Sequence, residues 1–339
     1  MWRINGQDHI LKQIEPSLEL GQPAHAYLLV GPPHVGKMTL ALDLAQAVNC
    51  SNPSPAPCHE CLQCTRIADG HHADVRVVGI SQDDDDGRTR TVIGIDSIKE
   101  VLHQVSLKPY EGIFTVIIFN EAETMSIEAA NALLKTLEEP PNQVLLLLLT
   151  SNEDAVLTTV RSRCRRLNLL PLSKAQIEHQ LESLDKESSN HSERLARLSR
   201  GCLGWAITAR EDPRILEEHE AQLDHLREVC QGNLDQKFAY ASEVATIFSR
   251  DRETARQILY LWLRWWRDLL LVKERAEDYL QYPHRLESLR SAASELSTTE
   301  TVSVIKHLQE TLASLDSNAN PRLALEAFMV RLPRSHIKR

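Results

Sequence analysis

Short, continuous apolar runs alternate with helical periodicities along the first half of the chain. The apolar runs predict three buried strands, over residues 26–30, 113–119 and 144–149, and residues 75–80 are a candidate for a further strand. Between them, apolar residues recur every three or four positions, which predicts helices over residues 8–20, 38–48, 95–107 and 126–138. Buried strands that alternate with helices are typical of an α/β domain whose parallel sheet is covered on both faces. We therefore expect an α/β fold for this part of the chain.

The pattern changes after residue 171, where no further strand is predicted. Residues 173–210 predict a few short helices that end near Gly201 and Gly204. The remainder is helical, and helix breaks are expected near Gly232, Pro283, residues 318–321 and Pro333. Three domains follow from this layout: an α/β domain over 1–170, a small helical domain over 171–212 and an all-α domain over 213–339.

The composition allows a buried core and limits the class of partner. Of the 339 residues, 42% are hydrophobic and 25% are charged, the balance of a globular protein. The 38 Lys and Arg residues against 47 Asp and Glu residues give a net charge of −9, which excludes a generally basic protein that coats DNA. The longest aliphatic run, Val144 to Leu149, is far shorter than the roughly 20 residues of a membrane span. Because the N-terminus also lacks a basic-then-apolar signal segment, we expect a cytoplasmic protein.

Four of the seven cysteines lie close together in the sequence with the spacing C-x7-C-x2-C-x2-C. They are Cys50, Cys58, Cys61 and Cys64. In a reducing compartment this spacing favours a metal site over disulfides, and four thiolates in a tetrahedron suit structural zinc. We predict a zinc knuckle over about residues 50–72; the alternative is a loop of reduced cysteines. Four thiolates would leave no open position for a catalytic water.

Two further sets of polar or reactive residues are assigned no chemistry. Cys164, Cys202 and Cys230 stand alone, and we expect them to be buried apolar residues rather than ligands. The acidic run Asp83–Asp86 is interpreted as a solvated loop, because four consecutive carboxylates cannot all point at one ion.

A phosphate-binding motif follows the first predicted strand. Residues 31–37 read G-P-P-H-V-G-K, which fits G-x-x-x-x-G-K between a strand and a helix. The backbone N–H groups between Gly31 and Gly36 could cradle phosphates at a helix N-terminus, and Lys37 could add a positive charge. This context predicts a phosphate-loop fold.

Two positions that normally organise Mg²⁺ are altered. Met38 stands where a Ser or Thr hydroxyl usually holds the ion, and Thr39 lies about 100° further around the helix. Asn120-Glu121 follows the predicted strand 113–119, where an ATPase normally has Asp-Glu; Asn120 is neutral, although Glu121 could still orient a water. Both changes affect the same ion, so we expect poor or absent hydrolysis. Two alternatives remain: ATP is bound weakly, without a productively held Mg²⁺, or the loop is retained only as a structural turn.

Polar residues at the end of the last predicted strand could sense a phosphate. Ser151 and Asn152 stand at this position. Arg163 follows in a basic stretch and could reach the nucleotide of a different subunit, where a guanidinium stabilises the transferring phosphate. From spacing alone, the alternative is a solvated basic surface.

Longer motifs resemble the replication clamp-loader family of AAA+ proteins, in its bacterial DNA polymerase III branch. Between Ile93 and Cys164 the chain reads IGIDSIKEVLHQVSLKPYEG, VIIFNEAETMSIEAANALLKTLEEPP and LLTSNEDAVLTTVRSRC. The start, HAYLLVGPPHVGK, and the four-cysteine knuckle fit the same branch. Residues 259–273 and 320–333 resemble the family's collar domain, and residues 201–205 resemble its second-sensor region without the sensor arginine.

The resemblance implies an AAA+ P-loop domain with a zinc knuckle, a helical lid and an all-α collar in a five-subunit ring. The altered Met38 and Asn120 point to the member that does not hydrolyse ATP rather than to the gamma/tau ATPase. Arg163, in the family's Ser-Arg-Cys motif, would then be a finger supplied in trans to a neighbouring gamma/tau subunit. The implied partners are gamma/tau and delta, with the beta sliding clamp and primer–template DNA reached through the complex.

Two alternative functions and one structural question remain open. The chain could be an active AAA+ ATPase of the gamma/tau type. It could be a zinc-dependent nucleic-acid-binding module, which is disfavoured because the knuckle lacks a basic and aromatic surface. The three tryptophans Trp262, Trp265 and Trp266 could pack in a core or form an aromatic patch that faces another subunit.

Overall fold

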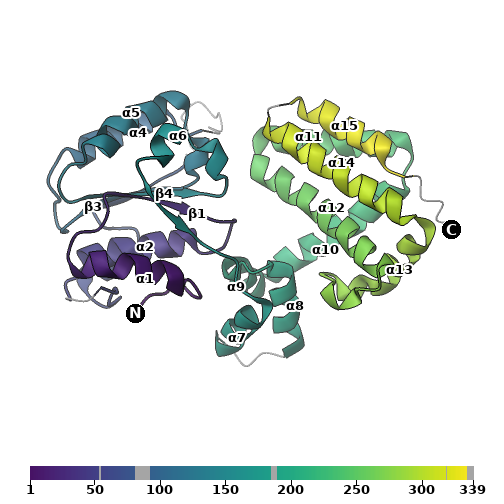
Figure 1. Cartoon of the computed structure of the whole chain (residues 1–339), viewed down its shortest axis with the longest axis horizontal. Coiled ribbons are helices and arrows are strands. Elements are labelled where there is room, and N and C mark those ends of the chain that lie inside the picture. The colour runs from purple at the N-terminus through teal and green to yellow at the C-terminus, as the bar shows by residue number, and fades with distance from the viewer. Residues whose placement is uncertain (53–54, 81–91, 185–188, 318, 334–339) are drawn as a thin grey trace. The chain divides into compact units, whose positions relative to one another are not determined.

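The computed structural model describes residues 1–52, 55–80, 92–184, 189–317 and 319–333 (Figure 1). The predicted acidic loop Asp83–Asp86 lies outside the described residues. The chain divides into two compact units, Met1–Ile207 and Thr208–Arg339. Within the described ranges, no helix is both long enough and apolar enough to cross a membrane.

A five-stranded, all-parallel sheet forms the centre of the first unit. Its strands are β1 (Ala26–Val30), β2 (Val75–Val78), β3 (Thr115–Phe119), β4 (Val144–Thr150) and β5 (Arg165–Asn168). They are ordered β2-β3-β4-β1-β5. The predicted parallel sheet is therefore confirmed. Non-consecutive strands lie side by side in this order, so the connections cross over the faces of the sheet, as in nucleotide-binding α/β folds.

The sheet differs from the prediction at four places, of which the smallest is that strand β4 continues to Thr150 instead of ending at residue 149. Strand β3 begins at Thr115 rather than at residue 113, because the N–H groups of Ile113 and Phe114 donate to the Asn49 Oδ1 at 2.7 and 2.8 Å. Strand β2 ends at Val78 rather than at residue 80. Strand β5 was not predicted, since Leu167 is its one buried residue and the other three are exposed.

Apolar layers cover both faces of the sheet, because successive side chains of a strand point to opposite faces. In β1, Leu28 and Val30 belong to one layer and Tyr27 and Leu29 to the other. The first layer packs under α4 (Ile95–Val105), α5 (Ile127–Glu138) and α6 (Thr158–Arg161), and the second over α1 (Asp8–Glu19), α2 (Lys37–Asn49) and α3 (Leu62–Ala68). Figure 1 shows α4 and α5 above the sheet and α1 and α2 below it.

Three helices follow the sheet: α7 (Lys174–Leu184), α8 (Ser189–Ser199) and α9 (Leu203–Glu211). Gly201 separates α8 from α9 with a φ of +87°, as expected of a glycine. Gly204 lies within α9, so the prediction that a helix ends there is wrong. The separate lid over 171–212 stays a prediction, since α7 and α8 group with the sheet.

The described residues of the second unit form helices and connecting loops, with no strand. It contains α10 (Pro213–Gln231), α11 (Leu234–Arg250), α12 (Arg252–Lys273), α13 (Leu286–Glu295), α14 (Thr298–Asp316) and α15 (Pro321–Arg331). Side-chain caps fix several starts: Asn233 and Ser297 form capping boxes at α11 and α14, and Asn320 caps α15. The predicted breaks agree with these bounds: α10 ends just before Gly232, Pro283 lies between the end of α12 and the start of α13, α14 ends at Asp316 before residues 318–321, and α15 ends just before Pro333.

The three tryptophans of α12 belong to the core of this second unit. Trp262, Trp265 and Trp266 are 0%, 3% and 3% exposed. The indole N–H of Trp262 donates to the Tyr240 hydroxyl at 3.0 Å, and its ring meets Phe328 edge-on at 5.6 Å. Core packing is therefore confirmed, and the subunit-facing aromatic patch is wrong.

The three isolated cysteines differ from their prediction. Cys164, Cys202 and Cys230 are half-buried rather than fully buried. Burial still raises the pKa of the Cys164 thiol to about 12, so the thiol remains protonated and packs against the apolar layer under α5. An apolar role therefore fits Cys164 even though part of its surface is open.

Candidate functional site

The phosphate loop connects β1 to α2, and both of its motif glycines are required by the backbone. Gly36 has a φ of +106°, which L side chains rarely adopt. A Cβ on Gly31 would lie 2.8 Å from the carbonyl oxygen of Leu169, and one on Gly36 would lie 2.5 Å from the Cδ1 of Ile4. The chain therefore packs closely around this loop from two directions.

The lysine of the loop is bonded to the protein itself. Its ammonium donates to the carbonyl oxygens of Gly31 and Pro32, at 2.6 and 2.9 Å, and to the Ser151 Oγ at 3.0 Å. Lys37 therefore ties the loop to the end of β4. Phosphate binding at this loop would have to compete with these contacts.

A second contact holds the loop from the side of α9. The backbone N–H of Gly204 donates to the His34 carbonyl at 3.0 Å. A Cβ at Gly204 would lie 2.8 Å from the same oxygen, so the approach depends on glycine. This contact involves the segment 201–205, which resembles the second-sensor region.

The position for a magnesium-binding hydroxyl is occupied by an apolar side chain. Met38 is half-buried and packs against the apolar layer over α1 and α2. Thr39 is exposed and follows it in the first turn of α2. The residue after the lysine thus contributes to packing, and its thioether is a poor ligand for a hard cation.

The acidic segment after β3 places a different carboxylate at the site from the one predicted. Asn120 continues the strand by donating its N–H to the Val78 carbonyl at 2.8 Å, and Glu121 is exposed with a φ of +56°. Glu123 instead accepts the N–H of Ser151 at 2.9 Å. Sequence reasoning missed Glu123; its place three residues after Asn120, in a segment rich in acids, was the available signal.

Lys37, Ser151 and Glu123 therefore form one connected group at the carboxyl ends of β1, β3 and β4. This edge of a parallel sheet is where ligands bind in open α/β folds. Asn152 is half-buried, and its N–H donates to the Thr150 Oγ1 at 3.1 Å. The structure thus brings together the loop lysine and the predicted sensor serine, but with an acid beside them.

Arg163 does not contact this group; it is bonded to α5, to α6 and to the residue just before it. Its Nη2 forms an ion pair with the Glu138 Oε1 at 2.6 Å. Its Nη1 donates to the Thr159 carbonyl at 2.9 Å and to the Ser162 Oγ at 3.3 Å. Its side chain is 34% exposed. The arginine is therefore oriented by α5 and α6 and remains partly open to solvent.

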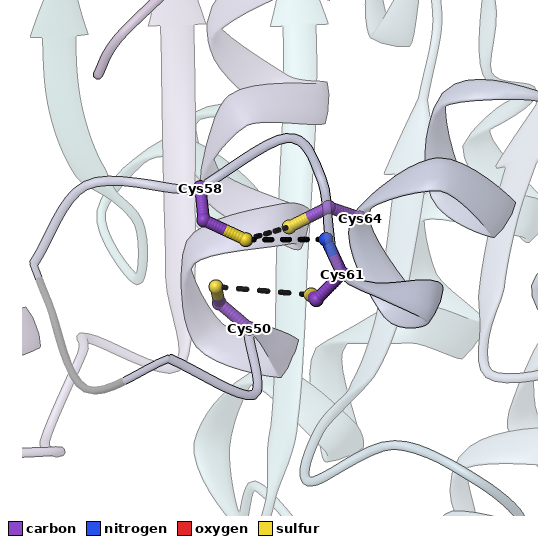
Figure 2. Close-up of side chains that lie close together, drawn as sticks. All are labelled: Cys50, Cys58, Cys61 and Cys64. Carbon is purple, nitrogen blue, oxygen red and sulfur yellow. Dashed lines mark hydrogen bonds between the residues drawn. The ribbon is translucent and has the colours of Figure 1, made fainter.

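The four cysteines of the knuckle converge from separate elements (Figure 2). Cys50 follows α2, Cys58 lies in the loop, and Cys61 and Cys64 belong to the start of α3. The part of the knuckle from Leu62 to Ala68 is thus helical. All four Sγ atoms lie within 4.8 Å of one another, and both the Cys50–Cys61 and Cys58–Cys64 pairs are 3.9 Å apart.

This spacing fits a tetrahedral metal shell. With a Zn–S distance of about 2.3 Å, the edge of a tetrahedron is about 3.8 Å. Burial raises the pKa of the Cys64 thiol. At Cys61 burial also acts to raise the pKa, but hydrogen bonds from the backbone N–H groups of Ser51 and Cys64, together with those from the Cys64 and Cys58 side chains, lower the pKa to about 6. A bound dication would favour the thiolate at all four positions.

The knuckle is attached to the rest of the domain. The buried Gln46 side chain of α2 donates to the Cys64 carbonyl at 2.7 Å. The N-terminal ammonium of Met1 donates to the Pro57 carbonyl at 2.7 Å, and the Met1 carbonyl lies 2.6 Å from the His59 Nε2. The knuckle therefore anchors the N-terminal segment next to α2.

Comparisons with known proteins find relatives among the subunits of DNA polymerase III. A family model described as "DNA polymerase III, delta subunit" matches residues 6–173. The chain is 28% identical over 327 residues to the DNA polymerase III subunit delta' of Bacillus subtilis, an alignment that covers 96% of each chain.

Other relatives align with part of their length. The chain is 37% identical over 211 residues to the DNA polymerase III subunit tau of Escherichia coli, which covers 60% of this chain and 31% of tau. It is 31% identical over 257 residues to the DNA polymerase III subunit gamma of Buchnera aphidicola subsp. Acyrthosiphon pisum, which covers 74% of this chain and 68% of gamma.

Proposed function

The chain belongs to the family of bacterial DNA polymerase III clamp-loader subunits, and on this premise we propose that it is a delta-prime-type subunit that does not hydrolyse ATP. The alignment over 96% of both chains with the delta' subunit of Bacillus subtilis supports this subunit type. In this role it would join gamma/tau and delta in a cytoplasmic five-subunit ring that loads the beta sliding clamp onto primer–template DNA.

The observation that carries the proposal is that the two positions that normally serve Mg²⁺ at a phosphate loop hold a thioether, at Met38, and a neutral amide, at Asn120. Met38 packs into an apolar layer, and Asn120 has no charge to offer the ion. Phosphoryl transfer depends on Mg²⁺ as a central charge, so losing both groups harms turnover more than nucleotide contact. The internal contacts of Lys37 with two loop carbonyls support the same conclusion.

Arg163 would serve a neighbouring gamma/tau subunit. Its guanidinium is partly exposed and lies just beyond α6, in the Ser-Arg-Cys motif of the family. An arginine supplied in trans stabilises charge on the transferring phosphate and contributes about 10³–10⁵ in rate in well-studied cases. The subunit would thus act on ATP through its neighbour.

The knuckle would hold one structural zinc ion. Four thiols at tetrahedral spacing satisfy zinc fully and leave no position for a reacting water. Its contacts with Gln46 and Met1 support a role in fixing the N-terminal segment on the domain.

A second candidate function is an active ATPase of the gamma/tau type. It is favoured by the identity of 37% with tau over 211 residues, which exceeds the 28% found with delta'. It requires another hydroxyl and carboxylate to replace the missing magnesium ligands. Thr39 offers a hydroxyl, and Glu121 and Glu123 offer carboxylates.

ATP turnover distinguishes the two functions. We expect the isolated chain to hydrolyse ATP poorly or not at all in the presence of Mg²⁺. We expect a ring reconstituted with gamma/tau and delta to have reduced ATPase and clamp-loading activity when Arg163→Ala replaces the wild type. Brisk turnover by the isolated chain would favour the second function. A ring with Arg163→Ala that is fully active would refute the finger.

A further inference from the structure

We infer that Glu138 is a positioning residue that holds Arg163 in a standby conformation and gives it up to the phosphate of a neighbouring subunit's nucleotide. This inference rests on the proposed trans role of Arg163. Glu138 belongs neither to the phosphate-loop group nor to the knuckle, and its one ion pair with Arg163 joins α5 to the turn after α6.

The contacts of Arg163 divide into two kinds. The Nη1 bonds to groups of its own turn, the Thr159 carbonyl and the Ser162 Oγ. The Nη2 bonds at 2.6 Å to a carboxylate from another helix, the Oε1 of Glu138. The first kind fixes the side chain on its own turn; the second neutralises its charge. Breaking the second alone would free a charged guanidinium whose Nη1 contacts are still in place.

The position of Glu138 is not the one that helix electrostatics favours. It is the last residue of α5, where the unpaired carbonyls carry partial negative charge and a cation is preferred. The positive charge of Arg163 offsets this repulsion. Glu139, the next residue, is equally acidic and exposed but forms no ion pair among the described residues. The pairing is therefore specific to one of two adjacent acids.

Exchange of partners is electrostatically reasonable. The ion pair as a whole has no net charge, and while it lasts the Nη2 of Arg163 is directed at Glu138 rather than at a transferring phosphate. The terminal phosphate of ATP carries more negative charge than a carboxylate and competes for the same donors. The Glu138 side chain is 51% exposed, so the ion pair is weak and can be exchanged. An exposed pair of this kind shifts an equilibrium by about 1.4- to 5-fold.

The test uses rings reconstituted with gamma/tau, delta and four variants of this chain: Glu138→Gln, Glu139→Gln, Arg163→Ala and the double variant Glu138→Gln/Arg163→Ala. We expect Glu138→Gln to raise ATP hydrolysis by about 1.4- to 5-fold at low salt, because the finger is no longer held back. The gain should shrink at high salt, where the wild-type pair is already screened. Glu139→Gln should match the wild type, and the double variant should match Arg163→Ala.

Each other outcome overturns the inference. If Glu138→Gln behaves like Glu139→Gln, the carboxylate does not restrain the finger. If Glu138→Gln lowers hydrolysis, Glu138 orients the finger during the reaction instead of holding it in standby. If the gain persists in the double variant, it does not act through Arg163. Full activity of Arg163→Ala would refute the finger itself, so failure of the proposed function is distinguished from failure of the inference. Thermal unfolding of the Gln variants checks that their folds are unchanged.

Discussion

Helix α2 carries one candidate ligand site at each end, and the two sites differ in how complete their ligand sets are. At its C-terminal end, Cys50 joins three other cysteines, and together the four could complete a metal shell. At its N-terminal end, the phosphate loop keeps Gly36 and Lys37 but lacks the hydroxyl and carboxylate for Mg²⁺. Under the proposed function, the cysteine set has been retained and the magnesium ligands have been lost. Variants at the two ends of α2 should therefore fail in different ways.

The largest effect is expected at the knuckle. Cys58→Ser should lose the metal, about one zinc per chain, because structural zinc sites contribute roughly 10–16 kcal/mol of apparent binding free energy in small modules. Metal analysis measures the loss. Hydrogen exchange should also rise at the N-terminal segment, since Met1 is held by Pro57 and His59. Cys230→Ser, which changes a cysteine outside the knuckle, is the matched control, and this variant should keep the zinc of the knuckle. Unchanged metal content in Cys58→Ser would show that the ligand set is wrong.

The phosphate loop should respond as a structural element. Lys37→Met removes three contacts of the ammonium and should lower the free energy of unfolding by about 1–2 kcal/mol without any nucleotide. Lys135→Met, in the last turn of α5, is the control. Denaturant unfolding measures both variants. Equal stability of the two would mean that the contacts of the Lys37 ammonium do not stabilise the loop and that the loop is not a structural turn.

The acid stability of the segment beside the knuckle should depend on Asp74. Burial alone would raise the pKa of this carboxyl, but the N–H groups of Tyr110, Glu111 and Gly112 donate to it and hold the pKa below its ordinary value. Its stabilisation is therefore present above about pH 4 and is lost as the pH falls through the folded-state pKa. Asp74→Asn should flatten the acid limb of the stability–pH curve. The exposed Asp69→Asn should leave that limb intact; an unchanged limb in Asp74→Asn would remove Asp74 as its cause.

The smallest effect is expected for the finger. Arg163→Ala should change the free energy of unfolding by about 0.5 kcal/mol or less, because the ion pair with Glu138 is solvent-exposed. Thermal unfolding measures it. A loss of several kcal/mol would mean that the arginine is structural, and that any activity defect of the variant reflects misfolding.

Much of the sheet could be predicted because its central strands are continuously apolar. β1, β3 and β4 are buried at every position, and their short apolar runs follow directly from that burial. Strand β5 escaped prediction because its single buried residue, Leu167, gives no pattern. The knuckle could be predicted because its ligands all lie between residues 50 and 64 of the sequence.

The polar contacts of the sites could not be predicted in the same way. Lys37 and Ser151 are separated by 114 residues, and their contact depends on the order of the strands. Glu123 and Glu138 lie in stretches that resemble the family, but the sequence does not indicate that packing brings them to Ser151 and Arg163. Sequence periodicity predicts which face a residue occupies but not which distant side chain it meets.

ATP turnover by the isolated, zinc-loaded chain, measured with and without Mg²⁺ beside its Lys37→Ala variant, tests most directly whether the magnesium site has been lost. If it has, the wild type and the variant should hydrolyse ATP equally slowly, at the background rate, with no dependence on Mg²⁺. Turnover that requires Mg²⁺ and disappears in Lys37→Ala would contradict this loss.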